Sequence, residues 1–484
     1  MRRYSSLHLA LALSVLALAC STDEFVSSDA GADVTIDGDT LPEAGPEVPP
    51  PCDANEAPSP TGIYVSKDGN DTSGTGTTIA PFASVGKAVT AAIQSASKDV
   101  YVAEDTYVEP TELVVKETAA GIRVHGGWKK AGLTWTKDCA EGFRDRTVIS
   151  SPTNVGIRVQ YATVAGPFEL EGLTLTTKGQ GASPADARGE SMYGVFIEPN
   201  GSLKITAVHV VAGKAGAGGA SSAQPAATGT ISCDGLAACT GGSVPANGGA
   251  GPDSAVGGTY AIDGFHPADG AAGSNGTAGS NGTAGSTGTP DTCVGPCAGQ
   301  CQSSDSCVNG IATNLQGQKG KCGCGGNAGA GGKPGHGGGA SVGAYVAGGG
   351  KLIADYSRIT STGGGAGSVG GTGGGGSGGS NGAAGSAVTC NTACGRNGPV
   401  GGACGCVFTA SKQLAGGATG GPGVAGSAGG NGGGGAGGDA YGYVTFGGGA
   451  VTIADAKRVI FVVGAAGKGA GNAPAGLRAD SAAK

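Results

Sequence analysis

Cysteine is the residue type whose number and spacing most clearly predict chemistry in this chain. The sequence has 484 residues and 15 cysteines, and apart from Cys20 the cysteines fall into three even-numbered groups. Even groups predict disulfide bonds in an oxidising compartment, whereas the short spacings CxxxC and CxC leave zinc as the alternative. Only 5 histidines are available as further zinc ligands, so we expect disulfides of undetermined pairing and no metal. The disulfide candidates are Cys52 and Cys139; Cys233, Cys239, Cys293, Cys297, Cys301, Cys307, Cys322 and Cys324; and Cys390, Cys394, Cys404 and Cys406.

The first twenty residues have the pattern of an export signal. Arg2 and Arg3 precede an apolar run over 7–18 that is too short to span a bilayer as a permanent helix. A small residue followed by Cys20 resembles the cleavage site of a bacterial lipoprotein signal, which implies that Cys20 is lipidated and begins the mature chain. The serine that follows implies, by the habit of such lipoproteins, the outer membrane or cell surface of a Gram-negative bacterium. An ordinary secretory signal is the alternative.

Composition separates the next segment from the rest of the chain. Residues 21–60 hold ten acidic residues, no lysine or arginine, and three consecutive prolines at 49–51. Such a segment cannot bury enough apolar surface to collapse, so it is expected to be a tether. The whole chain has a net charge of −7 and no basic cluster, which argues against a nucleic-acid partner.

Short β-rich segments recur between glycine tracts. Three of them align, beginning at residues 193, 342 and 441, and each has an apolar strand, a glycine turn and a second alternating strand. Val195 and Ile197, Leu203 and Ile205, and Val451 and Ile453 show the period of two that turns one face inward. Short strands that recur with glycine turns predict an all-β protein of the parallel β-helix type.

A family resemblance agrees with this prediction. The segment from 63 to 93 has a starting strand, a turn, Pro81-Phe82 and an amphipathic helix near 83–96, and Asp105-Thr106-Tyr107 follows a further strand. This order resembles the N-terminal module of bacterial proteins in the pectate-lyase-like superfamily. The resemblance implies a right-handed parallel β-helix whose first rung is covered by a capping helix, which buries Val85, Ala88, Val89 and Ala92.

Glycine recurs with a period of three in the insertions. The chain has 103 glycines, and every third residue is glycine from 364 to 385 and again from 417 to 438. This period fits the three residues per turn of polyproline II or polyglycine II, in which glycine lines one face and lets main chains approach. We expect each insertion to run out in this conformation, turn at a disulfide-stapled tip and return. A disordered Gly/Ser spacer is the alternative.

These patterns divide the chain into seven predicted parts. They are a lipoprotein signal peptide (1–19), an acidic tether (20–60), a capping module with the first β-helix rungs (61–212), a glycine- and cysteine-rich insertion (213–340), another rung (341–363), a Gly-X-Y insertion with cysteines (364–440), and the last rung with a C-terminal tail (441–484).

Two glycine-flanked residues match fragments of known sites. His336 in GHG resembles a polygalacturonase motif, but the acidic and basic partners of that motif are absent, and flanking glycines are common in this tract. Asp439 fits one copy of a calcium-binding repeat that requires consecutive copies. We interpret both matches as coincidence.

Two further sets could contact sugars. Trp128 and Trp135 are more simply explained as a plug for the end of the core. Asp355 with Arg358, and Asp455 with Arg458, recur in aligned rungs and could form an outward ladder. We interpret the ladder as a solvated strand face with weak ion pairs, with a sugar-binding groove as the alternative.

The sequence as a whole predicts a non-enzymatic surface lipoprotein with a structural or adhesive role. The expected partners are the membrane, through the lipid, and polysaccharide or extracellular matrix, and no cofactor is expected. The resemblance leaves a polysaccharide lyase or glycoside hydrolase as the alternative. A third and more distant alternative is ice or crystal binding, which the regularly spaced hydroxyl side chains at 273–290 suggest.

Overall fold

The computed structural model describes residues 52–95, 97–233, 239–288, 291–293, 312–315, 317–389 and 413–484. Within these ranges the regular secondary structure is mostly parallel β-sheet, with one α-helix, so the predicted all-β class is confirmed. The predicted signal peptide, the predicted lipidation site Cys20 and most of the predicted tether lie outside the described residues.

Three parallel sheets, here called A, B and C, form one part of the protein. The strands enter sheets A, B and C in rotation, so neighbouring strands of a sheet come from successive turns of the chain. This arrangement is consistent with a parallel β-helix-like fold, and no sheet closes on itself within the described ranges. Sheet A contains β1 (Ile63–Val65), β2 (Asp99–Ala103), β5 (Arg123–Ala131), β9 (Phe168–Glu171), β12 (Ser202–Thr206), β19 (Lys351–Asp355) and β24 (Ala450–Ile453), with β6 (Thr134–Lys137) antiparallel to β5; sheet B contains β3 (Asp105–Val108), β7 (Thr147–Ser150), β10 (Thr174–Thr176), β13 (His209–Ala212), β20 (Arg358–Ser361) and β25 (Ile460–Val463); sheet C contains β4 (Leu113–Lys116), β8 (Val155–Gln160), β11 (Met192–Ile197), β18 (Ser341–Ala347), β23 (Ala440–Phe446) and β26 (Arg478–Ala483).

Alternate residues of these strands form the main core. Val195, Ile197, Leu203 and Ile205 are all 0 % exposed and belong to one large apolar cluster. The inward face predicted from their spacing is therefore confirmed. Full burial of each such side chain contributes about 1.5–3 kcal/mol relative to exposure, so stacking successive turns is the main source of stability here.

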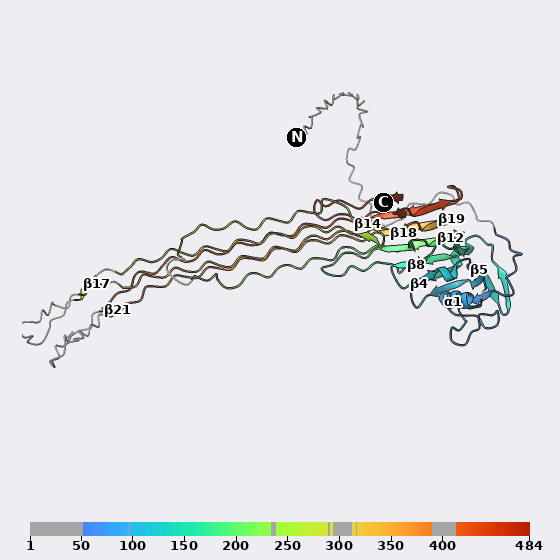
Figure 1. The fold of residues 1–484 in the computed structure, drawn as a ribbon, viewed down its shortest axis with the longest axis horizontal. Coiled ribbons are helices and arrows are strands. Elements are labelled where there is room, and N and C mark those ends of the chain that lie inside the picture. The colour runs from blue at the N-terminus through green and yellow to red at the C-terminus, as the bar shows by residue number, and fades with distance from the viewer. Residues whose placement is uncertain are drawn as a thin grey trace, which may run out of the picture. The chain divides into compact units, whose positions relative to one another are not determined.

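The helix α1 (Val85–Ser95) packs its predicted apolar face against the same core. Val85, Ala88, Val89 and Ala92 are buried in the cluster that also contains residues of β1. The Glu109 carboxylate accepts the amide N–H groups of Val85 and Gly86, at 2.8 and 3.0 Å, at the start of the helix. α1 packs against β1 and β2, and Figure 1 shows it at the end of the stacked strands that is away from β19. Two short 3₁₀ helices, η1 (Glu117–Ala119) and η2 (Phe143–Arg146), join strands.

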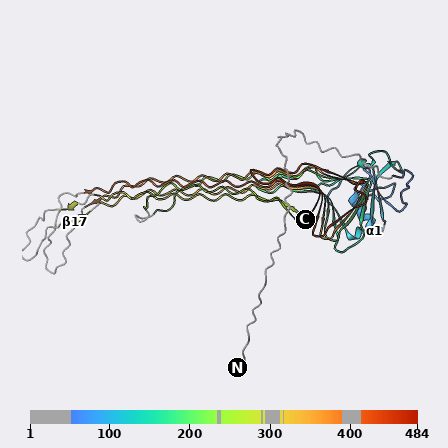
Figure 2. The same ribbon diagram turned by 90° about the horizontal axis from the view of Figure 1, so that it is seen from above.

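The glycine-rich segments run side by side as extended chains (Figures 1 and 2). Every third amide from Gly270 to Gly288 donates to a carbonyl between Gly335 and Gly317, at 2.8–3.3 Å. The segment 323–338 in turn donates every third amide to 421–436, which donates every third amide back to 268–283. The segment 365–383 contacts both 323–338 and 421–436. Its amides donate to carbonyls in 321–339, and its carbonyls accept from amides in 420–438. We call these four segments, with the flanking segments 213–232, 239–258 and 464–476, the glycine bundle.

Glycine is required in the bundle because the main chains are in direct contact. A Cβ atom built on Gly273 would lie 2.1 Å from the carbonyl oxygen of Gly430, and one on Gly379 would lie 2.2 Å from that of Gly423. Neither distance is compatible with any side chain. The period-three frame therefore marks the face of each segment that touches a neighbour.

Short polar side chains bind amides that have no main-chain acceptor. Asn275 and Asn281 accept the N–H groups of Gly331 and Gly325 through their side-chain oxygens, at 2.8 and 2.9 Å. Ser377 Oγ accepts the N–H of Asn327 at 2.7 Å in the same way. These side-chain oxygens supply the hydrogen-bond acceptors that a neighbouring main chain would otherwise provide. The serine and asparagine residues in the triplets therefore contribute to the structure of the bundle.

Three antiparallel strand pairs lie between the described glycine-rich segments. The hairpin of β14 (Thr259–Ala261) and β15 (Gly264–His266) packs against the outer face of sheet C. Phe265 and Tyr260 contact a cluster that includes Tyr193, Tyr345 and Tyr441. The other two pair β16 (Asp291–Cys293) with β17 (Ala312–Leu315) and β21 (Val388–Thr389) with β22 (Gln413–Leu414).

Candidate functional site

Six of the fourteen disulfide candidates pair in the described part of the chain. Cys52 bonds to Cys139, 87 residues along the chain, and this bond lies beside the first turns of the sheets. Cys233 bonds to Cys324 and Cys239 to Cys322, so the CGC motif joins two other segments of the glycine bundle. These two bonds link neighbouring segments of the bundle along their length, in addition to the staples predicted at the tips. The side chains of the remaining candidates, Cys293, Cys297, Cys301, Cys307, Cys390, Cys394, Cys404 and Cys406, lie outside the described residues, as does Cys20.

The two tryptophans are not available for stacking on a sugar. Trp128 is 0 % and Trp135 is 6 % exposed, and both pack in a cluster with Tyr64 and Tyr101. The rings of Tyr101 and Trp128 meet edge to face with centroids 5.0 Å apart. A buried role is the one that the structure supports.

The glycine-flanked residues Asp439 and His336 form hydrogen bonds with other parts of the fold. Asp439 is buried and accepts hydrogen bonds from Tyr260 Oη at 3.1 Å and from the amide of Leu477 at 2.7 Å. Burial raises the pKa of Asp439, which is unfavourable for an ionised calcium ligand. His336 lies in the glycine bundle, where its amide donates to Ser368 Oγ at 2.9 Å.

The recurring Asp–Arg pairs meet across turns of the chain but do not form two parallel rows. Arg458 Nε lies 3.4 Å from Asp355 Oδ1 and 3.5 Å from Asp455 Oδ2. Its guanidinium also lies 4.5 Å from the centre of the Tyr356 ring. Arg358, by contrast, is opposite Ile460 in the register of β20 and β25, so the two arginines are not aligned. Ion pairs of this partly exposed kind contribute little stability.

A pair of carboxylates that the sequence did not indicate lies beside the Cys52–Cys139 bond. Burial raises the pKa of Glu104, whereas the pKa of Asp138 is lowered to about 2, because hydrogen bonding to charged and backbone groups outweighs its burial. Two carboxyl groups with opposed pKa values are typical of acid–base catalysis. However, Arg146 and Lys129 bind Asp138, with the lysine Nζ at 3.1 Å, and its side chain is only 7 % exposed. The arrangement therefore resembles a structural ion network more closely than a site that opens to a substrate.

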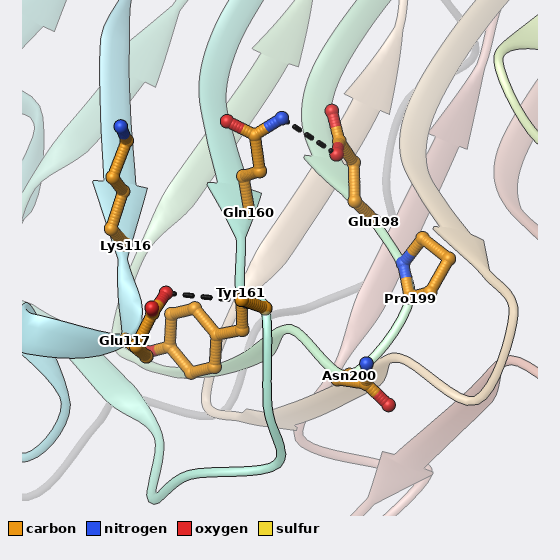
Figure 3. A pocket seen from close by; sticks show the side chains of 8 residues that line it. Lys116, Glu117, Gln160, Tyr161, Glu198, Pro199 and Asn200 are labelled. Carbon is orange, nitrogen blue, oxygen red and sulfur yellow. Dashed lines mark hydrogen bonds between the residues drawn. The ribbon is translucent and has the colours of Figure 1, made fainter.

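An open pocket of about 470 Å³ lies where β4, β8 and β11 end in turns (Figure 3). Lys116, Gln160 and Glu198 come from the three neighbouring strand ends, and their side chains project in the same direction. Asn200, in the turn after β11, lines the same pocket with a positive φ of 66°. Apart from the Asn-Gly turn, no sequence pattern indicates this site, because its residues are far apart in the chain and belong to no motif.

Hydrogen bonds within the pocket fix some of its groups and leave others open. Gln160 Nε2 donates to Glu198 Oε2 at 3.0 Å, and Arg158 Nη1 donates to Glu198 Oε1 at 3.3 Å. Glu117 Oε2 accepts the amide of Ala162 at 3.2 Å, and backbone hydrogen bonds lower the pKa of Glu117. The pocket thus combines two carboxylates, one ammonium group and two side-chain amides.

A second open pocket, of about 500 Å³, lies beside β1 and the turns before and after it. Its hydroxyl groups are paired with protein atoms: Thr75 and Thr77 bond to each other at 3.1 Å, and Ser97 donates to the carbonyl of Thr61 at 3.0 Å. It therefore offers fewer free hydrogen-bonding groups than the pocket at the strand ends.

No protein-family model, curated protein or solved structure matches this chain. In the ranges that the structure describes, no helix is long and apolar enough to cross a bilayer. The same ranges contain no group of three or more histidine, cysteine or acidic side chains placed to hold a metal ion.

Proposed function

We propose that this protein is an exported, non-enzymatic surface protein with a structural or adhesive role. The observation that carries the proposal is the glycine bundle, in which segments from distant parts of the chain exchange main-chain hydrogen bonds at every third residue. Such a bundle exposes few side chains able to do chemistry, yet it is held by many hydrogen bonds and two disulfides. These are the properties of a rigid structural element whose role is to present a surface.

The proposed architecture is a right-handed parallel β-helix with α1 as the cap of its first rung. The rotation of strands through sheets A, B and C supports this proposal, as does the burial of the apolar face of α1. The glycine segments would have the polyglycine II conformation, which the period of three in their hydrogen bonds supports.

Anchoring is proposed to occur through a lipid on Cys20, in the outer membrane of a Gram-negative bacterium. The basic start, the short apolar run and the small residue before the cysteine support this proposal. The three disulfides support an oxidising compartment. The acidic segment before the sheets would then hold the folded part away from the membrane.

The proposed partner is polysaccharide of the cell surface or matrix. The pocket at the ends of β4, β8 and β11 supports it, because hydroxyl-rich ligands are recognised by side-chain amides, carboxylates and ammonium groups such as those of Gln160, Asn200 and Lys116.

Expression of the full chain in a Gram-negative host, with labelled fatty acid in the medium, tests the anchor and the adhesive role together. We expect the label in the parent protein and in a Cys52→Ala control, and its loss in Cys20→Ala. Cells with the anchored protein should be retained on polysaccharide-coated surfaces, and cells with Cys20→Ala should not. An unlabelled parent, or equal retention of all three strains, would contradict the proposal.

A polysaccharide lyase or glycoside hydrolase is the second candidate function. The opposed pKa shifts of Glu104 and Asp138 are the observation in its favour. Cleavage of any member of a broad glycan panel by the parent protein, lost in Glu104→Gln, would establish it in place of the non-enzymatic role.

A further inference from the structure

We propose that the pocket at the ends of β4, β8 and β11 binds a neutral, hydroxyl-rich sugar chain that lies across the three strands. This inference rests on the proposed polysaccharide partner, and it adds the place of binding and the chemical class of the ligand. The residues assigned to recognition are Lys116, Gln160, Glu198 and Asn200.

The register of sheet C places the binding groups in a row. Lys116 is directly opposite Gln160 in the pairing of β4 with β8. Glu198 directly follows Ile197, which is opposite Val159, so Glu198 continues the same row on the next turn of chain. Neighbouring strands are about 4.8 Å apart, a spacing close to the length of one pyranose ring. An extended sugar chain that runs across the strands can therefore offer successive rings to successive side chains.

The groups that remain open complement hydroxyls. Within the described residues, neither the Lys116 ammonium nor the Asn200 side-chain amide has a hydrogen-bond or salt-bridge partner. Gln160 uses its Nε2 to reach Glu198, and its side-chain oxygen points toward the side of the row on which Lys116 lies (Figure 3). A sugar hydroxyl both donates and accepts, so it can bond to the ammonium, to either amide and to the carboxylates.

Charge selects a neutral ligand over an acidic one. Glu117 and Glu198 bring two negative charges to the wall of the pocket, whereas Lys116 brings one positive charge. Arg158, which comes two residues before Gln160 on β8, is already bound to Glu112 at 2.7 Å and to Glu198 at 3.3 Å. A uronate would therefore meet more repulsion than attraction, and it would lack the free bidentate arginine that carboxylate recognition favours.

The position of Asn200 makes the site testable with little effect on the fold. Its φ of 66° lies in the left-handed region, which glycine adopts at least as readily as asparagine. Asn200→Gly therefore removes the side-chain amide and keeps the turn. Gln160→Ala removes an exposed side chain at the end of β8.

Calorimetric titration of the full mature chain with neutral and uronate oligosaccharides tests the proposal. We expect the parent to bind at least one neutral β-linked hexasaccharide and to bind oligouronates more weakly. The double variant Gln160→Ala/Asn200→Gly should bind about tenfold more weakly or worse, as loss of two hydrogen bonds implies. Lys351→Ala, on the exposed start of β19, is the matched control and should bind like the parent. Circular dichroism checks that each variant is folded.

Each other result overturns a defined part of the account. Tighter binding of uronates would overturn the ligand class. Equal binding by the parent and the double variant would overturn the site and leave the polysaccharide partner in place. A parent that binds no sugar would overturn both the site and the partner, whereas fatty-acid labelling and hydrogen exchange would still test the anchor and the structural role.

Discussion

At Gly426 a side chain would collide with the main chain of a neighbouring segment. A Cβ atom there would lie 2.1 Å from the carbonyl oxygen of Asn327. At Gly378, in the segment that pairs with 420–438, nothing lies within 4 Å of such an atom. The two residues are the same in type and in glycine-rich context, and they differ in the contact that their backbone makes.

The contrast gives a prediction for two alanine substitutions. Gly426→Ala should cost about 1–3 kcal/mol, the usual penalty of overpacking a site that cannot expand. Gly378→Ala should leave stability unchanged or raise it by up to about 1 kcal/mol, because alanine has less freedom in the unfolded chain. Chemical denaturation followed by circular dichroism measures both. Equal effects of the two substitutions would mean that the bundle is not packed as described.

The contacts of the buried residue His125 predict that the stability of the fold depends on pH. His125 Nδ1 lies 3.1 Å from Glu171 Oε2, and its Nε2 lies 3.1 Å from Asp99 Oδ1. The hydrogen bond from His125 holds the pKa of Glu171 below its ordinary value of 4.5, against the opposing effect of burial. A carboxylate with a lowered folded-state pKa stabilises the fold above its unfolded pKa, and this contribution is lost as the pH falls through the folded pKa.

His125→Gln should therefore be less stable than the parent in buffers just above 4.5, the ordinary pKa of Glu171, and the difference should narrow at lower pH. Urea unfolding at several pH values measures it. His266→Gln is the control, because His266 bonds to Asp263 in a pair whose side chains are 43 % and 68 % exposed. Its effect should be smaller, since exposed pairs contribute little. A difference for His125→Gln that does not change with pH would contradict the assignment.

At the scale of elements, the hairpin of β14 and β15 covers an aromatic row on sheet C. Phe265 is 7 % exposed, and its amide donates to Tyr193 Oη at 2.7 Å. Tyr345 Oη donates to the carbonyl of Ala261 in the same hairpin. Because segments of the glycine bundle enter and leave this hairpin, its contacts join the bundle to the sheets.

Phe265→Ala should cost about 3–5 kcal/mol, as for other buried aromatic residues, and should speed hydrogen exchange in 259–266. Ile262→Ala, in the same hairpin but 55 % exposed, should change stability by less than about 0.5 kcal/mol. Denaturation and mass-spectrometric exchange measure the two effects. Similar small effects of both substitutions would show that the hairpin does not hold the bundle to the sheets.

The sequence predicted elements whose periodicity is local. The helix near 83–96, the inward residues of the aligned strands and the glycine frame all repeat every 3.6, 2 or 3 residues, so a short window reveals them. The hairpin at 259–266 was missed although Asp263-Gly264 is a turn signal, because its strands are short and surrounded by glycine.

Arrangements that depend on distant segments could not be predicted. The pairing of Cys322 with Cys239 depends on which glycine segments become neighbours, and all of them have the same glycine period. The row of Lys116, Gln160 and Glu198 depends on how successive turns stack in sheet C. Neither fact has a local signature, because the residues involved are 38 or more positions apart.

At the scale of the whole molecule, one physical device unites the glycine bundle. Removal of the side chain at every third position lets extended chains touch, and each contact leaves one amide in three to bond to a neighbour. Serine and asparagine side chains bind amides on the remaining faces, and two disulfides link segments 83 and 91 residues apart. The stability of the glycine bundle therefore comes from the main chain more than from an apolar core, in contrast to that of the three sheets.

Residue-resolved amide hydrogen exchange by NMR tests this claim most directly. We expect slow exchange at Gly323, Gly326, Gly329 and Gly332, whose amides donate to 421–430, and fast exchange at exposed positions such as Gly378. Slow exchange at these four glycines, together with protection of Gly325, Asn327 and Gly331 through their side-chain acceptors, would support the bundle. Exchange at unstructured rates throughout 323–338 and 421–436 would contradict it.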